Sequence, residues 1–348
     1  MTEQYGAAGA PPAWRVFRAV GHRAPVGEGP RLPEPPRWRR FAGGPVQPLP
    51  DLDDTRTAER RLGEARDLVQ LRDEEIDVVN AAILLRRPLL VTGPPGVGKS
   101  TLAYLIAQEL GLGRVLQWGI VSRTTLSGGL YSYDAIGRAQ AIAAWRAGAD
   151  GAQSGEPAPR MGDFLTLGPL GTALLPYEQP RVLLIDELDK CDVDLPHDLL
   201  HVMENGAYDV PELMRSADPE ASVFTDDPGQ RTTVLRGRVE CHAFPIVVIT
   251  SNGEREFPLP LRRRCLPLEL RLPSREQLVA IVSSHLHGSE DVVRPLLDQF
   301  ERRVQDGGTH SVDQLLNAVQ LVTSGGFQHN SHGRKLVELL LRDLAKGR

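Results

Sequence analysis

One stretch decides the fold of this chain: Gly93-Pro94-Pro95-Gly96-Val97-Gly98-Lys99-Ser100-Thr101. It fits the pattern G-x-x-x-x-G-K-[ST], in which glycines let backbone N–H groups surround phosphate oxygens. The apolar residues 89–91 before it predict a buried strand, and the spacing of apolar residues over 100–110 predicts a helix that ends at Gly111. A strand, a glycine loop and a helix N-terminus in this order predict a nucleotide phosphate site.

Two side chains of the stretch are predicted to contact the nucleotide. Lys99 would reach the β- and γ-phosphates, and the Ser100 hydroxyl would bind Mg²⁺. Composition supports the lysine, because only four of the 40 basic residues are lysines and the others are arginines. A compact ammonium fits a phosphate cradle better than a planar guanidinium does.

A second stretch supplies acids. The apolar residues 182–185 predict a central parallel strand, and they are followed at once by Asp186 and Glu187. Asp186 is expected to hold Mg²⁺, directly or through water, and Glu187 to orient and deprotonate an attacking water. The alternative is an ordinary solvated strand end, which the P-loop upstream disfavours.

Two later features could complete such a site. Residues 244–251 predict another buried strand, and Asn252 at its end would hold the water between the carboxylates and the γ-phosphate, or would cap the strand. A turn then carries three adjacent arginines, including Arg263 and Arg264. They are either a solvated basic turn or arginine fingers that stabilise the phosphoryl group in a neighbouring subunit.

Length and composition limit the classes of function. The 348 residues allow two domains, and no apolar run approaches the length of a membrane span or a signal-peptide core, so we expect no membrane partner. Three scattered cysteines predict reduced thiols in the cytoplasm. Net charge is −5, and residues 1–50 carry seven Arg against three Glu, which leaves −9 on the rest. An acidic body disfavours nucleic acid as the main partner.

The N-terminal segment predicts an extended arm over residues 1–50, because it holds ten of the 28 prolines. Its aromatic residues include Trp14, Phe17, Trp38 and Phe41. Either the arm is a floppy tail, or Trp14 and Trp38 pin it to its own or a neighbouring body. An α/β nucleotide-binding domain would then cover residues 51–272 and a helical domain residues 273–348.

The stretches between the motifs predict further elements. They are helices over 53–85, a short strand over 114–118, an exposed loop over 122–131, a helix over 133–147, a loose insertion over 148–162, a helix over 195–205 and a hairpin insertion over 206–240. From residue 274 four helices are expected, over 274–286, 290–304, 311–323 and 333–346.

The order of these motifs resembles the AAA+ ATPases, and within them the MoxR group. The likeness to that group lies in the helix that runs into a hairpin at residues 199–206, the Gly-Pro-Leu piece within 164–170 and the segment over 250–260. The resemblance implies a P-loop AAA+ core, with a parallel sheet flanked by helices, and a small all-α lid.

The resemblance also implies roles. Walker A would be Gly93–Thr101, Walker B Val182–Glu187, sensor 1 Asn252, and the arginine finger Arg264, with Arg263 as the second candidate. It further implies a ring, usually a hexamer, with ATP and Mg²⁺ at subunit interfaces. Members of the group are chaperone-like and remodel or activate protein clients, often with a partner that bears a von Willebrand A domain.

Two departures from the family pattern stand out. Relatives often place a sensor 2 arginine at the start of the third lid helix, whereas this chain has Ser311-Val312-Asp313 there. Either another basic residue such as Arg303 serves, or the lid couples differently to ATP. Protein-threading relatives also carry an aromatic–apolar pair in a pore loop, for which Tyr131 is the candidate here, with helix packing as its alternative.

These features leave several functions to compare. The first is an ATPase ring that remodels a protein partner, and the second is an ATP-dependent assembly switch or scaffold with slow hydrolysis. A nucleic-acid motor is disfavoured by the acidic body, and a small-molecule kinase by the arginine turn and the helical C-terminal region.

Overall fold

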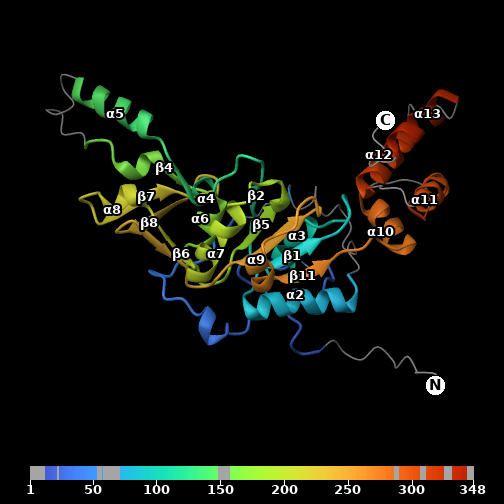
Figure 1. Cartoon of the computed structure of the whole chain (residues 1–348), viewed down its shortest axis with the longest axis horizontal. Helices are drawn as coiled ribbons and strands as arrows, with labels where there is room; N and C mark the ends of the chain where they lie inside the picture. Colours follow the sequence, from blue (N-terminus) through green and yellow to red (C-terminus); the bar gives the residue numbers. More distant parts are fainter. Residues whose placement is uncertain are drawn as a thin grey trace.

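The protein has a central α/β body, with helices α10 to α13 at one end and helix α5 at the other (Figure 1). The computed structural model describes residues 12–21, 23–52, 57, 71–147, 157–285, 290–305, 311–324 and 331–342. The predicted helix over 53–70, apart from Thr57, and most of the insertion over 148–162 lie outside the described residues. Among the described residues, no helix is long and apolar enough to cross a membrane.

The body is built on a parallel sheet of five strands in the order β11-β1-β10-β5-β2. The strands are β1 (Leu89–Thr92), β2 (Leu116–Gly119), β5 (Val182–Asp186), β10 (Ile246–Ser251) and β11 (Leu266–Glu269). Their central members are apolar at nearly every position because helices cover both faces. The predicted fold class, a P-loop AAA+ core with a parallel sheet flanked by helices, is confirmed.

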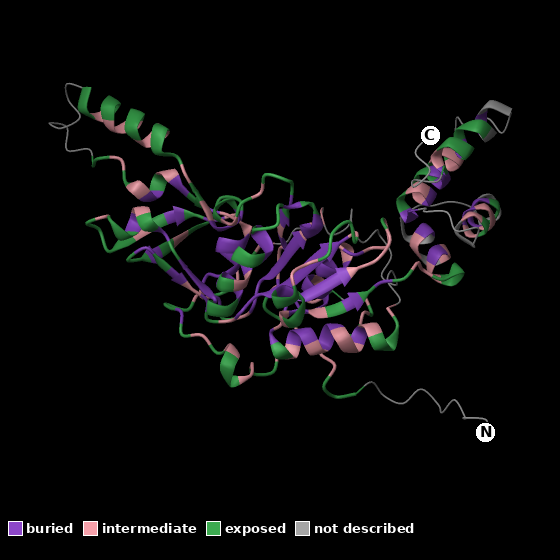
Figure 2. Cartoon of the chain, in the orientation of Figure 1, coloured by how far each residue is buried: buried purple, intermediate pink, exposed green. Residues whose placement is uncertain are grey.

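Alternate residues of each strand enter two different cores. Leu183 and Ile185 point to one face of the sheet, and Val182 and Leu184 point to the other. The second face packs against α2 (Asp73–Leu85) and α3 (Thr101–Glu109), and the first against α6 (Pro169–Ala173) and α7 (Leu195–Asn205). Figure 2 shows this buried centre.

A second sheet of six strands extends the first core, in the order β3-β4-β7-β8-β9-β6. Its strands are β3 (Tyr131–Tyr133), β4 (Leu165–Leu167), β6 (Ala207–Asp209), β7 (Glu220–Phe224), β8 (Arg231–Leu235) and β9 (Arg238–Glu240). The predicted hairpin over 206–240 therefore contains four strands and the short helix α8 (Pro211–Met214). A buried ion pair fixes this sheet to the body, since Arg181 Nη1 lies 2.7 Å from Asp227 Oδ2.

The exposed loop predicted over 122–131 is correct only for residues 122–125. The rest of the segment contains α4 (Leu126–Leu130), which starts where the Thr125 hydroxyl accepts a hydrogen bond from the Gly128 N–H. The helix expected from residue 133 is α5 (Ala135–Ala147), because residues 131–133 pair with β4 instead. None of the α5 residues is buried.

The C-terminal helices form a separate all-α unit with its own apolar core, which includes Leu278, Phe300 and Leu315. The helices are α10 (Arg275–His285), α11 (Glu290–Gln305), α12 (Val312–Thr323) and α13 (Ser331–Leu340). Within the described residues of this unit there is no strand.

The described part of the arm is extended, apart from the 3-10 turn η1 (Arg37–Arg39), and it packs along the body. Phe17 is fully buried, and the arm backbone beside it exchanges three hydrogen bonds with the buried side chain of Asn80. Trp14 is 43% exposed and Trp38 is 78% exposed, so neither tryptophan anchors the arm to its own body, and an anchor on a neighbouring body stays a prediction. The anchors are Phe17 and Phe41, whose ring stacks on Phe244.

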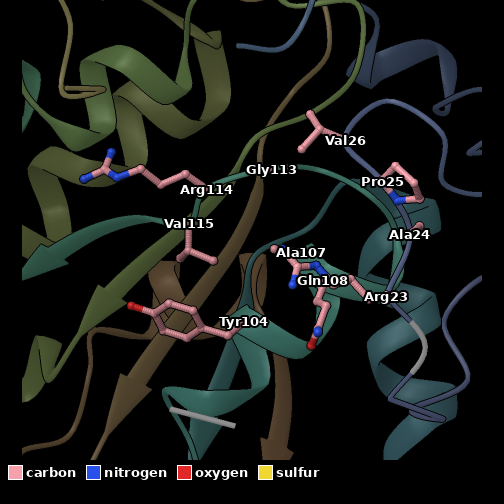
Figure 3. A pocket seen from close by; sticks show the side chains of 10 residues that line it. All are labelled: Arg23, Ala24, Pro25, Val26, Tyr104, Ala107, Gln108, Gly113, Arg114 and Val115. Carbon is pink, nitrogen blue, oxygen red and sulfur yellow. The ribbon is translucent and has the colours of Figure 1, made fainter. Parts of the chain in front are cut away.

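The arm also runs over the helix that follows the P-loop. Figure 3 shows Pro25 and Val26 of the arm lining a small pocket with Tyr104 and Gln108 of α3. The Ala24 N–H donates to the Gln108 carbonyl at 3.0 Å. The arm therefore contacts the element that carries the phosphate loop.

Candidate active site

The P-loop joins β1 to α3, and its glycines are required by the backbone. Gly93, Gly96 and Gly98 have φ values of 146°, 71° and 91°, which side-chain-bearing residues rarely adopt. A Cβ on Gly93 would lie 2.4 Å from the Leu270 carbonyl oxygen. The loop can therefore take its tight course only with glycine at these positions.

Lys99 folds back over the same loop. Its Nζ donates to the carbonyl oxygens of Gly93 and Pro94, each at 2.9 Å. Burial lowers the pKa of Lys99, and the carboxylates of Asp189 and Asp186 oppose that shift. The ammonium is thus held at the loop with acids nearby, where it can exchange carbonyl partners for phosphate oxygens.

Ser100 and Asp186 meet at the carboxyl end of β5. The Ser100 hydroxyl donates to Asp186 Oδ1 at 2.6 Å, and the Thr250 hydroxyl donates to the same oxygen at 2.7 Å. The side-chain amide of Gln117 lies 3.4 Å from Asp186 Oδ2. Three elements besides β5 therefore fix the carboxylate predicted to serve Mg²⁺.

Glu187 lies directly beyond β5 in the left-handed region, with φ 60°. Its N–H donates to the Thr250 hydroxyl at 2.8 Å. Its Oε1 accepts from Asn252 Nδ2 at 3.3 Å, and its Oε2 accepts from Lys190 Nζ at 2.5 Å. The hydrogen bond to Glu187 raises the pKa of Lys190. The structure thus brings the predicted base and the predicted sensor together.

Asp189 holds the backbone of the segment that follows β10. Its Oδ2 accepts from the N–H groups of Asn252 at 2.9 Å and Glu254 at 3.1 Å, and its side chain is 3% exposed. Sequence reasoning gave no role to Asp189, Lys190 or Thr250. All three occupy the two strand-end segments that the sequence singles out, which is the signal that could have found them.

The arginine turn forms α9 (Leu259–Arg264). The Arg264 guanidinium pairs with Glu204 at the end of α7 and donates to the Pro260 carbonyl at 3.2 Å. Arg263 is exposed. Within the described residues, neither arginine side chain contacts the P-loop of its own chain.

The lid touches the P-loop at the start of α12. A Cβ on Gly96 would lie 2.6 Å from the Ser311 Cβ, and the Ser311 hydroxyl caps the helix. Asp313 is exposed in the first turn. Arg303 donates to the carbonyl of Leu341, the residue that follows α13, so this contact lies inside the lid.

The pore-loop candidate Tyr131 lies in β3 and not in a free loop. Its hydroxyl donates to Glu212 Oε2 at 2.9 Å. Burial, with this hydrogen bond, raises the pKa of Tyr131 to about 12. The packing alternative therefore describes its contacts in this chain.

The residues present suit Mg²⁺ bound together with a nucleotide. A serine hydroxyl and one carboxylate are hard oxygen donors, and Mg²⁺ commonly takes few protein ligands and completes its shell with phosphates and water. Within the described ranges, no group of three or more His, Cys, Asp or Glu side chains could hold a metal by itself. Such a pair fits an ion that arrives with phosphate.

Comparisons with known proteins agree with the geometry. A curated relative, the Holliday junction branch migration complex subunit RuvB of Gluconobacter oxydans, is 26% identical over 237 residues, which are 68% of this chain and 48% of that protein. This chain thus spans about half the length of that relative.

Two solved structures of NtrX from Brucella abortus, in complex with ADP and with ATP, each align with a TM-score of 0.41 and 14% identity. The alignments cover 80% and 77% of this chain and 56% and 55% of NtrX. These scores are low, so the assignment rests on sequence. Residues 89–272, just over half of the chain, match the family described as ATPase family associated with various cellular activities (AAA). The chain belongs to this AAA family.

Proposed function

We propose that the chain is a Mg²⁺-dependent ATPase that binds ATP at the subunit interfaces of a ring and uses hydrolysis to remodel or activate a protein partner. One observation carries the proposal. Asp186, Glu187 and Asn252 gather at the carboxyl ends of the neighbouring strands β5 and β10, beside the loop that follows β1. Ligands of open parallel sheets bind at this edge.

Each side chain has a task in that reaction. The loop amides and Lys99 hold the phosphates, and Glu187 takes a proton from the attacking water that Asn252 orients. Ser100 and Asp186 would hold Mg²⁺, whose chemistry there would be to neutralise charge on the phosphate oxygens. Arg264 or Arg263 of a neighbouring subunit would reach the γ-phosphate, which agrees with the absence of a contact between either side chain and its own P-loop in the described residues.

Binding of a fluorescent ATP analogue and release of phosphate test the proposal together. Lys99→Ala should lose analogue binding, while the wild type should bind it and release phosphate at a rate that rises with protein concentration as subunits assemble. Turnover that is independent of concentration would contradict the shared site, and absence of turnover would contradict the ATPase itself.

The finer assignment, a MoxR-like and chaperone-like hexamer with a von Willebrand A partner, rests on the motif resemblance. It predicts that the Glu187→Gln variant, trapped with ATP and purified from its own host in the cytoplasmic fraction, retains a protein client. Retention of DNA in place of protein would contradict it.

The match to a branch migration subunit favours a second candidate, a nucleic-acid motor. It predicts that DNA stimulates phosphate release and binds with an affinity that falls steeply as salt rises over roughly 50–200 mM. The acidic charge outside the arm favours the protein partner instead.

A third candidate is an assembly switch with slow hydrolysis. The ion pair of Glu187 with Lys190 and the acidic Asp313 where a sensor arginine is expected favour it. It predicts nucleotide-dependent assembly with turnover near background, and assembly of Lys99→Ala without nucleotide would count against it.

A further inference from the structure

Arg87 connects the two halves of the proposed composite site within one subunit. It lies between the end of α2 and the start of β1, the strand that leads into the P-loop. Its guanidinium donates to the carbonyl oxygens of Arg264 at 3.0 Å and Cys265 at 3.3 Å, and also to that of Arg263. These are three consecutive carbonyls at the C-terminal end of α9.

The last carbonyls of a helix have no partner within the helix and carry its negative dipole end. Helix α9 has only six residues, so its own hydrogen bonds hold its last turn weakly. A guanidinium offers several donors in a fixed planar fork, whereas an ammonium is a single point of charge. Arg87 therefore suits a role as an external cap that fixes the backbone of the arginine turn.

The same contact ties the turn to the phosphate loop. The Leu266 N–H, just after α9, donates to the Pro88 carbonyl at 2.8 Å, and β11 then pairs with β1 from Leu89 onward. Helix α9 also packs against α7 and β11 (Figure 1). The backbone that carries Arg263 and Arg264 is thus anchored at the start of β1, the strand whose other end leads into Gly93 of the P-loop.

We propose that Arg87 is a positioning residue for the arginine finger: it sets the direction in which Arg263 and Arg264 reach a neighbouring subunit by binding the carbonyl groups of their backbone. The proposal rests on the proposed function. Its consequence is that loss of Arg87 damages the site of the next subunit, while the ATP site of the same subunit keeps its parts.

The test uses full-length Arg87→Ala and Arg87→Lys, with Arg231→Ala as a matched control. Arg231 is an exposed arginine of the second sheet that, like Arg87, donates to a backbone carbonyl, and it pairs in addition with the carboxylate of Asp163. Arg87→Ala should bind a fluorescent ATP analogue within about threefold of wild type and release phosphate at least tenfold more slowly. Arg87→Lys should release phosphate at an intermediate rate, because lysine keeps the positive charge but lacks the planar set of guanidinium donors. Arg231→Ala should release phosphate at the wild-type rate.

A mixing experiment separates positioning from general damage. Arg87→Ala has an intact ATP half-site and Lys99→Ala has an intact finger, so a mixture of the slow Arg87→Ala and the inactive Lys99→Ala should turn over faster than either variant alone. Wild-type turnover in Arg87→Ala, loss of analogue binding, or no recovery on mixing would overturn the assignment of Arg87. A wild type without turnover would instead contradict the proposed function.

Discussion

The side-chain amide of Asn252 lies 3.3 Å from Glu187 Oε1, so the ends of β10 and β5 meet at the carboxylate assigned to activate water. Backbone contacts fix both residues, because the N–H of Glu187 bonds to Thr250 and the N–H of Asn252 bonds to Asp189. The pair is thus held in place by Thr250 of β10 and by Asp189, which lies just beyond β5. This relationship is the basis of the hydrolytic assignment.

Removing the amide should slow hydrolysis and spare binding. Asn252→Ala is expected to lower phosphate release by about 10²-fold, since Glu187 and the water lose one positioning contact. Affinity for a fluorescent ATP analogue should stay within about threefold, because the hydrogen bonds of Asn252 among the described residues go to Asp189 and Glu187 and not to the P-loop. An equal loss in binding and turnover would assign Asn252 to nucleotide binding.

The arginine turn should act between subunits. Arg263→Ala/Arg264→Ala is expected to abolish turnover and to keep analogue affinity within several-fold, because both side chains lie outside the P-loop of their own chain. Mixing this variant with Lys99→Ala should recover part of the phosphate release. Absence of recovery would argue against a shared site.

The arm should stabilise the body through Phe17 and not through its exposed tryptophans. Phe17→Ala is expected to lower the free energy of unfolding by about 3–5 kcal/mol, as for other fully buried aromatic side chains. Trp38→Ala, the matched control on the same arm, should change it by no more than about 0.5 kcal/mol. Urea unfolding measures both, and equal effects would contradict the observed docking.

The buried pair of Arg181 and Asp227 should make stability depend on pH. Burial alone would raise the pKa of Asp227, but the hydrogen bonds from Arg181 outweigh it and lower that pKa. The carboxylate therefore stabilises the fold above its unfolded pKa of about 3.9, and this contribution is lost as pH falls through the lower folded value.

Asp227→Asn is accordingly expected to cost about 3–5 kcal/mol at pH 7, because it removes the charge partner of a buried arginine. The gap from wild type should narrow below about pH 4. Asp209→Asn, which alters an exposed pair with Arg238, should cost no more than about 1 kcal/mol at any pH. Chemical unfolding at pH 7, 4 and 3 checks both, and a gap that widens in acid would contradict the sign.

The sequence predicted those parts of the fold and site whose signals are local. The P-loop and the strand that ends in Asp186 and Glu187 were found because their chemistry lies within a few consecutive residues. The arm anchors were not, because Phe17 is held by Asn80, 63 residues away. The segment over 122–131 is a loop only over 122–125, because the cap at Thr125 and the pairing with β4 impose a helix and a strand on the residues whose glycines indicate a loop.

The most direct test of the account compares steady-state phosphate release by the wild type and Glu187→Gln at ring-forming concentrations. The substitution keeps the shape and the contact with Asn252 but removes the proton acceptor. The account predicts that both proteins bind ATP and that the wild type turns over at least about 10²-fold faster. A wild type that turns over no faster than Glu187→Gln would contradict it.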